Sequence, residues 1–135
     1  MAFQFGAFFA AFLAASAAPG APDLSVPAAA VEQQQSVPLI EPAALKAMMA
    51  SSMRYVLVDV RQPEEFAAGH INGATLMPLG ALEANYRTLP KDVKLVVYCR
   101  SGHRSAQAVS FLLAHGYDRA ISLNGGYLAW SAQAN

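Results

Sequence analysis

The sequence is most informative between residues 95 and 105, which read Leu95-Val96-Val97-Tyr98-Cys99-Arg100-Ser101-Gly102-His103-Arg104-Ser105. Residues 95–98 form a short apolar run, which predicts a buried strand. From Ser105 to His115 the apolar side chains repeat at helical spacing and Gly116 provides a terminator, so a helix is expected there. The loop that begins at Cys99 therefore lies where a buried strand ends and a helix begins.

The alternation of strand and helix continues on both sides of this stretch. Apolar or β-branched runs predict five strands, at residues 37–40, 55–60, 74–77, 95–98 and 120–123. Helices are expected at residues 41–51, 63–68, 79–86, 105–115 and 127–132. This order with short connections predicts an α/β fold, with a central parallel five-stranded sheet and helices on both faces.

The chain of 135 residues divides by composition into three segments. Residues 1–18 form an apolar run shorter than the roughly 20 residues that span a membrane, and they predict a signal peptide. Residues 19–36 are rich in Pro, Ala and Gln and predict a linker, which leaves a folded domain at residues 37–135. The leader predicts a periplasmic or secreted protein. Because it lacks Lys and Arg, a short membrane anchor and a cytoplasmic protein stay open as alternatives.

The overall composition excludes several classes of function. Nine Lys and Arg balance nine Asp and Glu, so the chain lacks the excess of positive charge that is typical of nucleic-acid-binding proteins. The single cysteine excludes an internal disulfide and a multi-cysteine zinc site. His70, His103 and His115 lie at unrelated places in the predicted fold, so we expect no metal site.

Cys99 lies at the carboxyl end of a predicted strand, where open parallel sheets bind their ligands. The tight loop after it leads into a helix N-terminus, so its N–H groups are expected to point inward and form an anion nest, with Gly102 permitting the backbone conformation. These N–H groups, with Arg100 and Arg104, favour the thiolate over the thiol. We therefore predict that Cys99 is a nucleophile and that the two arginines hold an anionic substrate.

Four motifs, in this order along residues 37–131, resemble those of the rhodanese-domain sulfurtransferases. They are Asp59-Val60-Arg61, the segment from Phe66 to Pro78 that contains Gly69-His70-Ile71, the loop of residues 99–105, and Leu123-Asn124-Gly125-Gly126-Tyr127-Leu128-Ala129-Trp130. The resemblance implies a single-domain rhodanese-like fold. It also implies a sulfur transfer that uses no metal and no organic cofactor.

The reaction that the resemblance implies has two half-reactions, with Cys99 as the catalytic residue. The thiolate takes the sulfane sulfur of a small anionic donor, thiosulfate or a persulfide, and passes it to cyanide, a thiol or a protein sulfur acceptor. Substrate-binding roles are implied for the loop residues and for one residue outside the loop: Arg100, Ser101, Gly102, His103, Arg104 and Arg61. We expect no nucleic-acid partner and no stable membrane span.

Two alternative functions remain open at this point. A persulfide carrier or docking module would use the same cysteine for a partner protein. The related phosphatases and arsenate reductases use a loop with five residues between Cys and Arg, whereas four separate Cys99 from Arg104, and Ser105 occupies the arginine position. The smaller ring suits one sulfur atom better than a phosphoryl or arsenate group. A non-catalytic scaffold is disfavoured by the intact loop.

Several other polar residues are expected to be structural. Asp59 and Arg61 are interpreted as an ion pair that holds the loop region, and Glu64 and Glu65 as charges in the first turn of a helix. His70 is expected to pack or to form a hydrogen bond in the turn before a strand.

Overall fold

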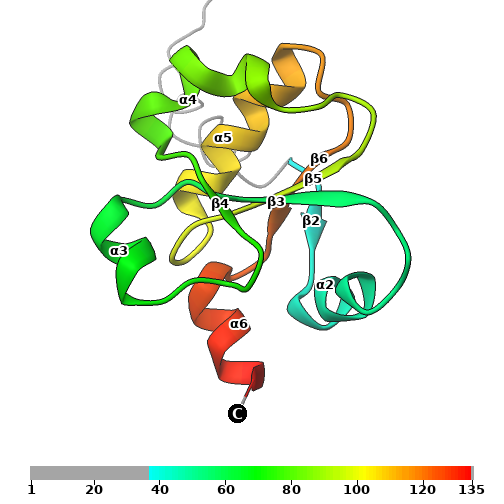
Figure 1. Ribbon diagram of the computed structural model, residues 1–135, viewed down its shortest axis with the longest axis vertical. Helices are drawn as coiled ribbons and strands as arrows, with labels where there is room; N and C mark the ends of the chain where they lie inside the picture. Colours follow the sequence, from blue (N-terminus) through cyan, green and yellow to red (C-terminus); the bar gives the residue numbers. More distant parts are fainter. Residues whose placement is uncertain (1–36, 135) are drawn as a thin grey trace, which may run out of the picture. The chain divides into compact units, whose positions relative to one another are not determined.

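The computed structural model of the protein describes residues 37–134, which are drawn as the coloured ribbon in Figure 1. The predicted signal peptide at residues 1–18 and the predicted linker at residues 19–36 lie outside the described residues, so both stay predictions, as does the domain boundary at residue 37. Within residues 37–134, no helix combines the length and the apolar character needed to cross a membrane.

Five strands form one sheet, as predicted. Their order across the sheet is β2 (Leu39–Ile40), β6 (Ala120–Leu123), β5 (Lys94–Tyr98), β3 (Tyr55–Asp59) and β4 (Thr75–Leu76). Every neighbouring pair is parallel. β3 and β5 pair over their whole length, so Asp59 lies opposite Tyr98 and both strands end at the same edge. The residues that follow these two strands therefore meet at the carboxyl edge of the sheet.

Helices cover both faces of the sheet (Figure 1). On one face lie α4 (Leu79–Asn85), the 3₁₀ helix Tyr86–Thr88 that continues it, and α5 (His103–Ala114). On the other face lie α2 (Pro42–Met49) and α6 (Gly126–Ala134). The short helix α3 (Pro63–Ala68) follows β3 at the carboxyl edge. This arrangement confirms the predicted α/β architecture and brings α3, α5 and α6 to the edge where β5 ends.

The side chains of β5 alternate between the two apolar layers, because successive strand residues point to opposite faces. Leu95 and Val97 join the layer under α4 and α5, whereas Val96 and Tyr98 join the layer under α2 and α6. Cys99 continues the alternation on the α5 side and is 1% exposed. This alternation of side chains along β5 therefore points the Cys99 thiol toward the start of α5.

α5 begins at His103, earlier than the predicted start at Ser105. Gly102 is the N-cap residue of this helix and has a φ of 114°, a left-handed conformation that glycine adopts without steric cost. The chain thus turns from strand to helix within a few residues. This tight turn places the N-terminus of α5 beside Cys99.

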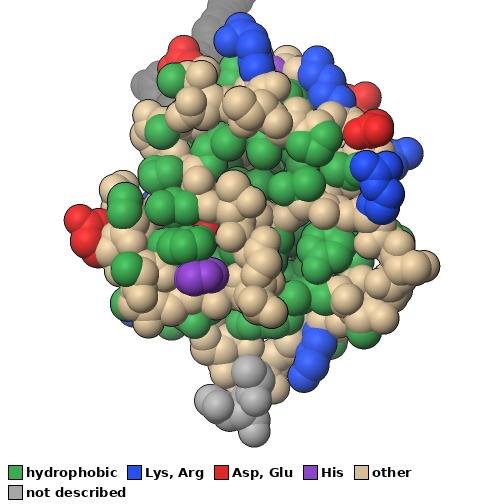
Figure 2. Space-filling model, viewed as in Figure 1, with side chains coloured by type: hydrophobic (Ala, Val, Ile, Leu, Met, Phe, Trp, Pro, Cys, Tyr) green, Lys and Arg blue, Asp and Glu red, His purple; other side chains and the backbone are tan. Residues whose placement is uncertain are grey.

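Charged side chains are sparse at the centre of the face shown in Figure 2. Acidic side chains lie at its left edge, over α3, the element that carries Glu64 and Glu65, and also on the upper rim, where most of the visible Lys and Arg lie. This face therefore presents no continuous basic patch.

Candidate active site

The sulfur of Cys99 contacts backbone N–H groups of the loop and of the first turn of α5. The N–H of Gly102 donates to Sγ at 3.0 Å, and the N–H of Ser105 donates at 3.4 Å. N–H groups in this position have no carbonyl partner within their own helix, so they are free to bind an anion. The predicted nest is therefore present, and Cys99 Sγ lies in it.

These contacts favour the thiolate of Cys99. Burial raises the pKa of the thiol, but hydrogen bonds from the Ser105 N–H and hydroxyl, and from the N–H groups of Gly102 and Ser101, together bring it below its ordinary value. A lower pKa increases the fraction of nucleophilic thiolate at neutral pH. The environment thus suits a reacting cysteine better than an inert core residue.

The hydroxyl of Ser105 also lies beside the sulfur. Ser105 Oγ is 3.6 Å from Cys99 Sγ, 3.2 Å from the carbonyl oxygen of Gly102 and 2.8 Å from Ser122 Oγ. Both serines are buried. Ser122 was not predicted as a site residue from the sequence. The feature that could have indicated it is a polar side chain among the apolar residues of β6.

The N-terminus of α6 holds the carbonyl groups of the loop. The N–H of Tyr127 donates to the Cys99 carbonyl at 2.8 Å, and that of Leu128 donates to the Arg100 carbonyl at 3.0 Å. Because the C=O and N–H of one peptide unit point in opposite directions, the N–H groups of Arg100 and Ser101 point away from α6. Gly126 permits this close approach, since a Cβ at that position would lie 2.5 Å from the Arg100 carbonyl oxygen.

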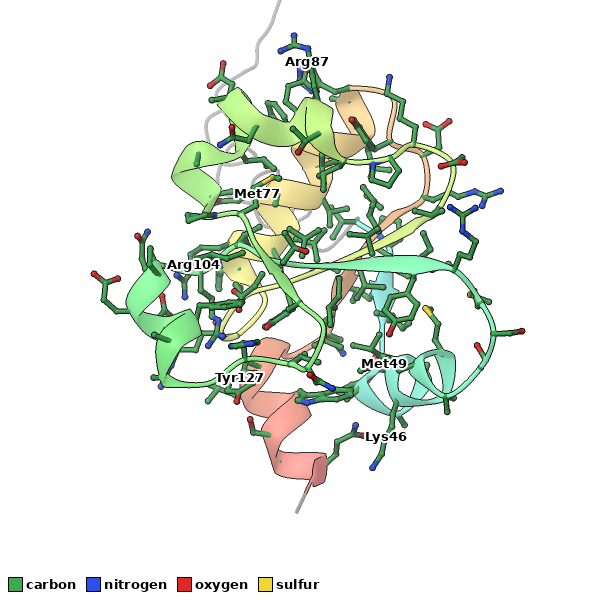
Figure 3. All side chains as sticks on the ribbon, in the orientation of Figure 1. Lys46, Met49, Met77, Arg87, Arg104 and Tyr127 are labelled. Atoms are coloured by element: carbon green, nitrogen blue, oxygen red, sulfur yellow. The ribbon has the colours of Figure 1, made fainter. Side chains whose placement is uncertain are left out.

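Arg104 forms an ion pair with Glu65 of α3. The Arg104 Nη1 and Nη2 atoms lie 2.8 and 3.1 Å from the two Glu65 carboxylate oxygens, and Figure 3 shows the Arg104 side chain beside α3. The hydrogen bond from Arg104 holds the pKa of Glu65 at about 2. Glu65 also accepts a hydrogen bond from the Gln62 N–H, which completes a capping box at the start of α3. Glu65 is thus more than the helix-start charge expected from the sequence, because it ties α3 to the first turn of α5.

Arg61 is buried and makes several contacts within the protein. Its Nη2 lies 2.7 Å from Asp59 Oδ2, which confirms the predicted ion pair, and it also donates to the Gly69 carbonyl at 2.7 Å. Its guanidinium stacks over the ring of Tyr127, 4.6 Å from the ring centroid. These contacts connect β3 to α6 and to the turn after α3, and the contact of Arg61 with substrate that the family resemblance implies stays a prediction.

Two hollows flank the loop. One, of about 210 Å³, is lined by Arg61, Glu65, Ala68, Gly69, Arg100, Tyr127 and Leu128. The other, of about 300 Å³, is lined by Leu39, Ser101, Gly102, His103, Ala106, Ser122, Leu123, Asn124 and Gly125. Arg100 is exposed and has no ion-pair partner within residues 37–134. Of the loop residues predicted to bind substrate, Arg100 thus lines the smaller hollow, whereas Ser101, Gly102 and His103 line the larger one.

The three histidines lie apart, and two of them have structural contacts. His70 Nδ1 donates to the Phe66 carbonyl at 2.9 Å, as expected for a structural residue, and His115 Nδ1 donates to the Phe111 carbonyl at 2.7 Å. His103 lines the larger of the two hollows by volume. In the described part of the chain, residues 37–134, no group of three His, Cys, Asp or Glu side chains is placed to hold a metal.

Known proteins resemble this chain in sequence and in fold. The family model described as rhodanese-like domain matches residues 41–133. A sulfurtransferase of Allochromatium vinosum is 39% identical over 92 residues, which cover 68% of this chain and 86% of that protein. The probable adenylyltransferase/sulfurtransferase MoeZ of Mycobacterium tuberculosis is 36% identical over 96 residues, which cover 70% of this chain and 24% of that protein.

A solved structure with the same fold is the human single-domain sulfurtransferase TSTD1, with 30% identity and a TM-score of 0.65. That match covers 73% of this chain and 98% of the human chain. The relatives support sulfurtransferase activity in general terms for this chain. Since the family model covers most of the chain and the fold agrees, the chain belongs to the rhodanese-like domain family.

Proposed function

We propose that the chain moves a sulfane sulfur from thiosulfate or a persulfide donor to a thiophilic acceptor through a persulfide on Cys99. The observation that carries this proposal is the contact of Cys99 Sγ with the N–H groups of Gly102 and Ser105, at 3.0 and 3.4 Å. Fixed N–H donors stabilise negative charge without reorganising during the reaction. They suit the thiolate before sulfur transfer and the anionic persulfide after it.

In the first half-reaction, the Cys99 thiolate attacks the outer sulfur of thiosulfate. A bond forms between Sγ and that sulfur, the sulfur–sulfur bond of thiosulfate breaks, and its electron pair leaves with sulfite. The negative charge of the enzyme then lies on the terminal sulfur of the persulfide. The N–H groups of the loop and the N-terminus of α5 stabilise this charge.

In the second half-reaction, the acceptor attacks the terminal sulfur. With cyanide, a carbon–sulfur bond forms, the persulfide bond breaks, and its electron pair returns to Sγ. The products are thiocyanate and the Cys99 thiolate, so the enzyme is ready for another cycle. A thiolate acceptor reacts in the same way and leaves with a persulfide of its own.

Arg100 is the residue that we propose attracts the anionic donor. It is exposed at the rim of the smaller hollow and has no ion-pair partner within residues 37–134. Arg104 attracts the anionic donor less strongly, because the Glu65 carboxylate neutralises its charge through two hydrogen bonds of 2.8 and 3.1 Å. The loop therefore carries one arginine without an ion-pair partner in the described residues, and this charge favours an anionic donor.

A persulfide carrier that serves a partner protein is the second candidate. Leu39 and Leu128 are each 48% exposed, and each lines one of the hollows beside the loop. A partner protein that docks over the loop would bury these two side chains, which adds apolar area to the contact. This candidate differs from the first in turnover, because a carrier would be loaded once and would wait for its partner.

The deciding experiment measures thiocyanate formation from thiosulfate and cyanide by the purified full-length chain. We expect turnover by the natural chain and none by Cys99→Ser, whose hydroxyl is a poor nucleophile. Ser110→Ala, in α5 but outside the contacts of Cys99, serves as the control and should keep its activity. A reduced natural chain that gives no thiocyanate but gains a sulfur atom from a persulfide donor would favour the carrier.

We also propose that residues 1–18 direct the chain out of the cytoplasm. The support is the length and the apolar character of this run, both properties of the sequence alone. Fractionation of the native host, with mass spectrometry of the N-terminal peptide, tests it. A cytoplasmic chain that keeps residues 1–18 would refute the proposal.

A further inference from the structure

Ser122 is a buried hydroxyl that the reaction described above does not use. It lies on β6, 1% of it is exposed, and within residues 37–134 its one side-chain hydrogen-bond partner is Ser105 Oγ, at 2.8 Å. Buried hydroxyl groups are costly unless they are hydrogen-bonded, so the contact with Ser105 must account for the presence of a polar side chain here. Ser105 in turn contacts the reacting sulfur.

Ser105 Oγ has one proton and three acceptors within reach. They are the Gly102 carbonyl at 3.2 Å, Ser122 Oγ at 2.8 Å and Cys99 Sγ at 3.6 Å. When Cys99 is a thiol, its S–H donates to Ser105 Oγ, and the Ser105 proton goes to one of the two oxygens. When Cys99 is a thiolate, the sulfur becomes the one charged acceptor of the three, and the Ser105 proton turns toward it.

This rotation leaves the lone pairs of the buried Ser105 Oγ in need of a donor. The Ser122 hydroxyl is the nearest group that can supply a proton, and donation into Ser105 Oγ polarises the Ser105 O–H toward the sulfur. We propose that Ser122 is a positioning residue for sulfur transfer: it donates to Ser105 Oγ and thereby directs the Ser105 proton to Cys99 Sγ whenever this sulfur is an anion. The inference rests on the proposed role of Cys99 as the sulfur carrier.

The charged groups around the thiol come from several elements. Arg104 of α5 interacts with Cys99 and is paired with Glu65 of α3, while Arg100 lies in the loop and Arg61 lies after β3. The three arginines and His103 are present in every variant, so their effect on the thiol is the same in all of them.

The test follows alkylation of the full-length chain by iodoacetamide as a function of pH. Cys99 is the single cysteine of the sequence, so the rate reports on its thiolate alone and requires no sulfur donor. We expect Ser122→Ala to move the midpoint of the profile to higher pH, with about two- to fivefold less thiolate below the midpoint. Ser105→Ala should move the midpoint further, and Ser110→Ala should leave it unchanged.

The double variant distinguishes a relay from a structural effect. Since Ser122 acts through Ser105, adding Ser122→Ala to Ser105→Ala should shift the midpoint no further. The proposal is overturned if Ser122→Ala shifts the midpoint of the Ser105→Ala chain by as much as it shifts that of the natural chain. It is also overturned if Ser122→Ala alone leaves the midpoint unchanged. If Ser122→Ala does not fold, the pair Ser122→Thr and Ser122→Val decides, because the two side chains have the same shape and differ in one hydroxyl. Equal profiles for this pair would refute the relay.

The proposed function can fail separately from this inference. A natural chain that forms no thiocyanate, but shows the expected set of alkylation profiles, would refute sulfur transfer from thiosulfate and leave the hydroxyl relay intact. A natural chain that forms thiocyanate, together with an unchanged alkylation profile in Ser122→Ala, would refute the hydroxyl relay and leave sulfur transfer from thiosulfate intact.

Discussion

Replacing Gly126 by alanine is predicted to disrupt the loop that begins at Cys99, although Gly126 lies outside that loop. Gly126 has a φ of 62°, and a Cβ on it would lie 2.5 Å from the Arg100 carbonyl oxygen and 2.6 Å from the Cys99 carbonyl oxygen. Backbone atoms cannot move aside as a flexible side chain can. Relief therefore requires α6 and the loop to separate, which breaks the hydrogen bonds from Tyr127 and Leu128 to these two carbonyls.

The size of the effect follows from these contacts. A left-handed conformation costs alanine about 1–2 kcal/mol more than glycine. Each of the two loop hydrogen bonds contributes about 0.5–1.5 kcal/mol, so their loss adds about 1–3 kcal/mol. Gly126→Ala should therefore lower the free energy of unfolding by about 2–5 kcal/mol. Cys99 should also be alkylated more slowly at neutral pH, because the N–H groups around it are displaced.

Urea unfolding of the full-length chain, followed by the fluorescence of its one tryptophan, measures this change. Gly80→Ala is the matched control. A Cβ on Gly80 meets no atom within 4 Å, and alanine is about 1 kcal/mol more favourable than glycine within a helix such as α4. The control should be as stable as the natural chain or more so. A Gly126→Ala chain within about 0.5 kcal/mol of the natural chain would refute the account of how α6 holds the loop.

Two further predictions concern the ion pairs near the loop. Glu65→Gln should lower the free energy of unfolding by at most about 1 kcal/mol at pH 7, because the pair with Arg104 is partly exposed. The pKa of Glu65 is lowered from 4.5 to about 2, so its stabilisation is complete above pH 4.5 and is lost as the pH falls toward 2. Urea titrations across this range test it, and a difference that stays constant down to pH 2 would contradict the assignment. Asp59→Asn should cost about 3–5 kcal/mol, because it leaves the Arg61 guanidinium buried without its anion. Unfolding curves measure this cost beside the exposed control Asp92→Asn, and a loss below about 1 kcal/mol would show that the buried pair is not needed.

Much of the fold could be predicted because each strand is a local apolar run. The run before Cys99 and the run before Asp59 are rich in β-branched residues, and both strands lie where they were expected. The third predicted strand, residues 74–77, is shorter in the structure, where β4 covers only Thr75–Leu76. β4 is an edge strand with one neighbour, so its length depends on pairing with β3, a contact that local periodicity does not report.

The candidate site could be predicted only in part, for a similar physical reason. Cys99 and its loop lie in one continuous stretch of sequence, so the strand, the turn and the helix that follows could be predicted from that stretch alone. The partner of Arg104 lies 39 residues away in α3, and the contact between Ser105 and Ser122 joins two different elements. Such contacts depend on the tertiary packing of α3, α5 and β6, and no local spacing in the sequence encodes them.

The central claim is that Cys99 carries the transferred sulfur. The most direct measurement is the intact mass of the full-length chain after reduction, incubation with thiosulfate and rapid desalting. The natural chain should gain the mass of one sulfur atom and should lose it again on addition of cyanide, while Cys99→Ser should gain nothing. A natural chain whose mass does not change, or a Cys99→Ser chain that gains the same sulfur, would contradict the account.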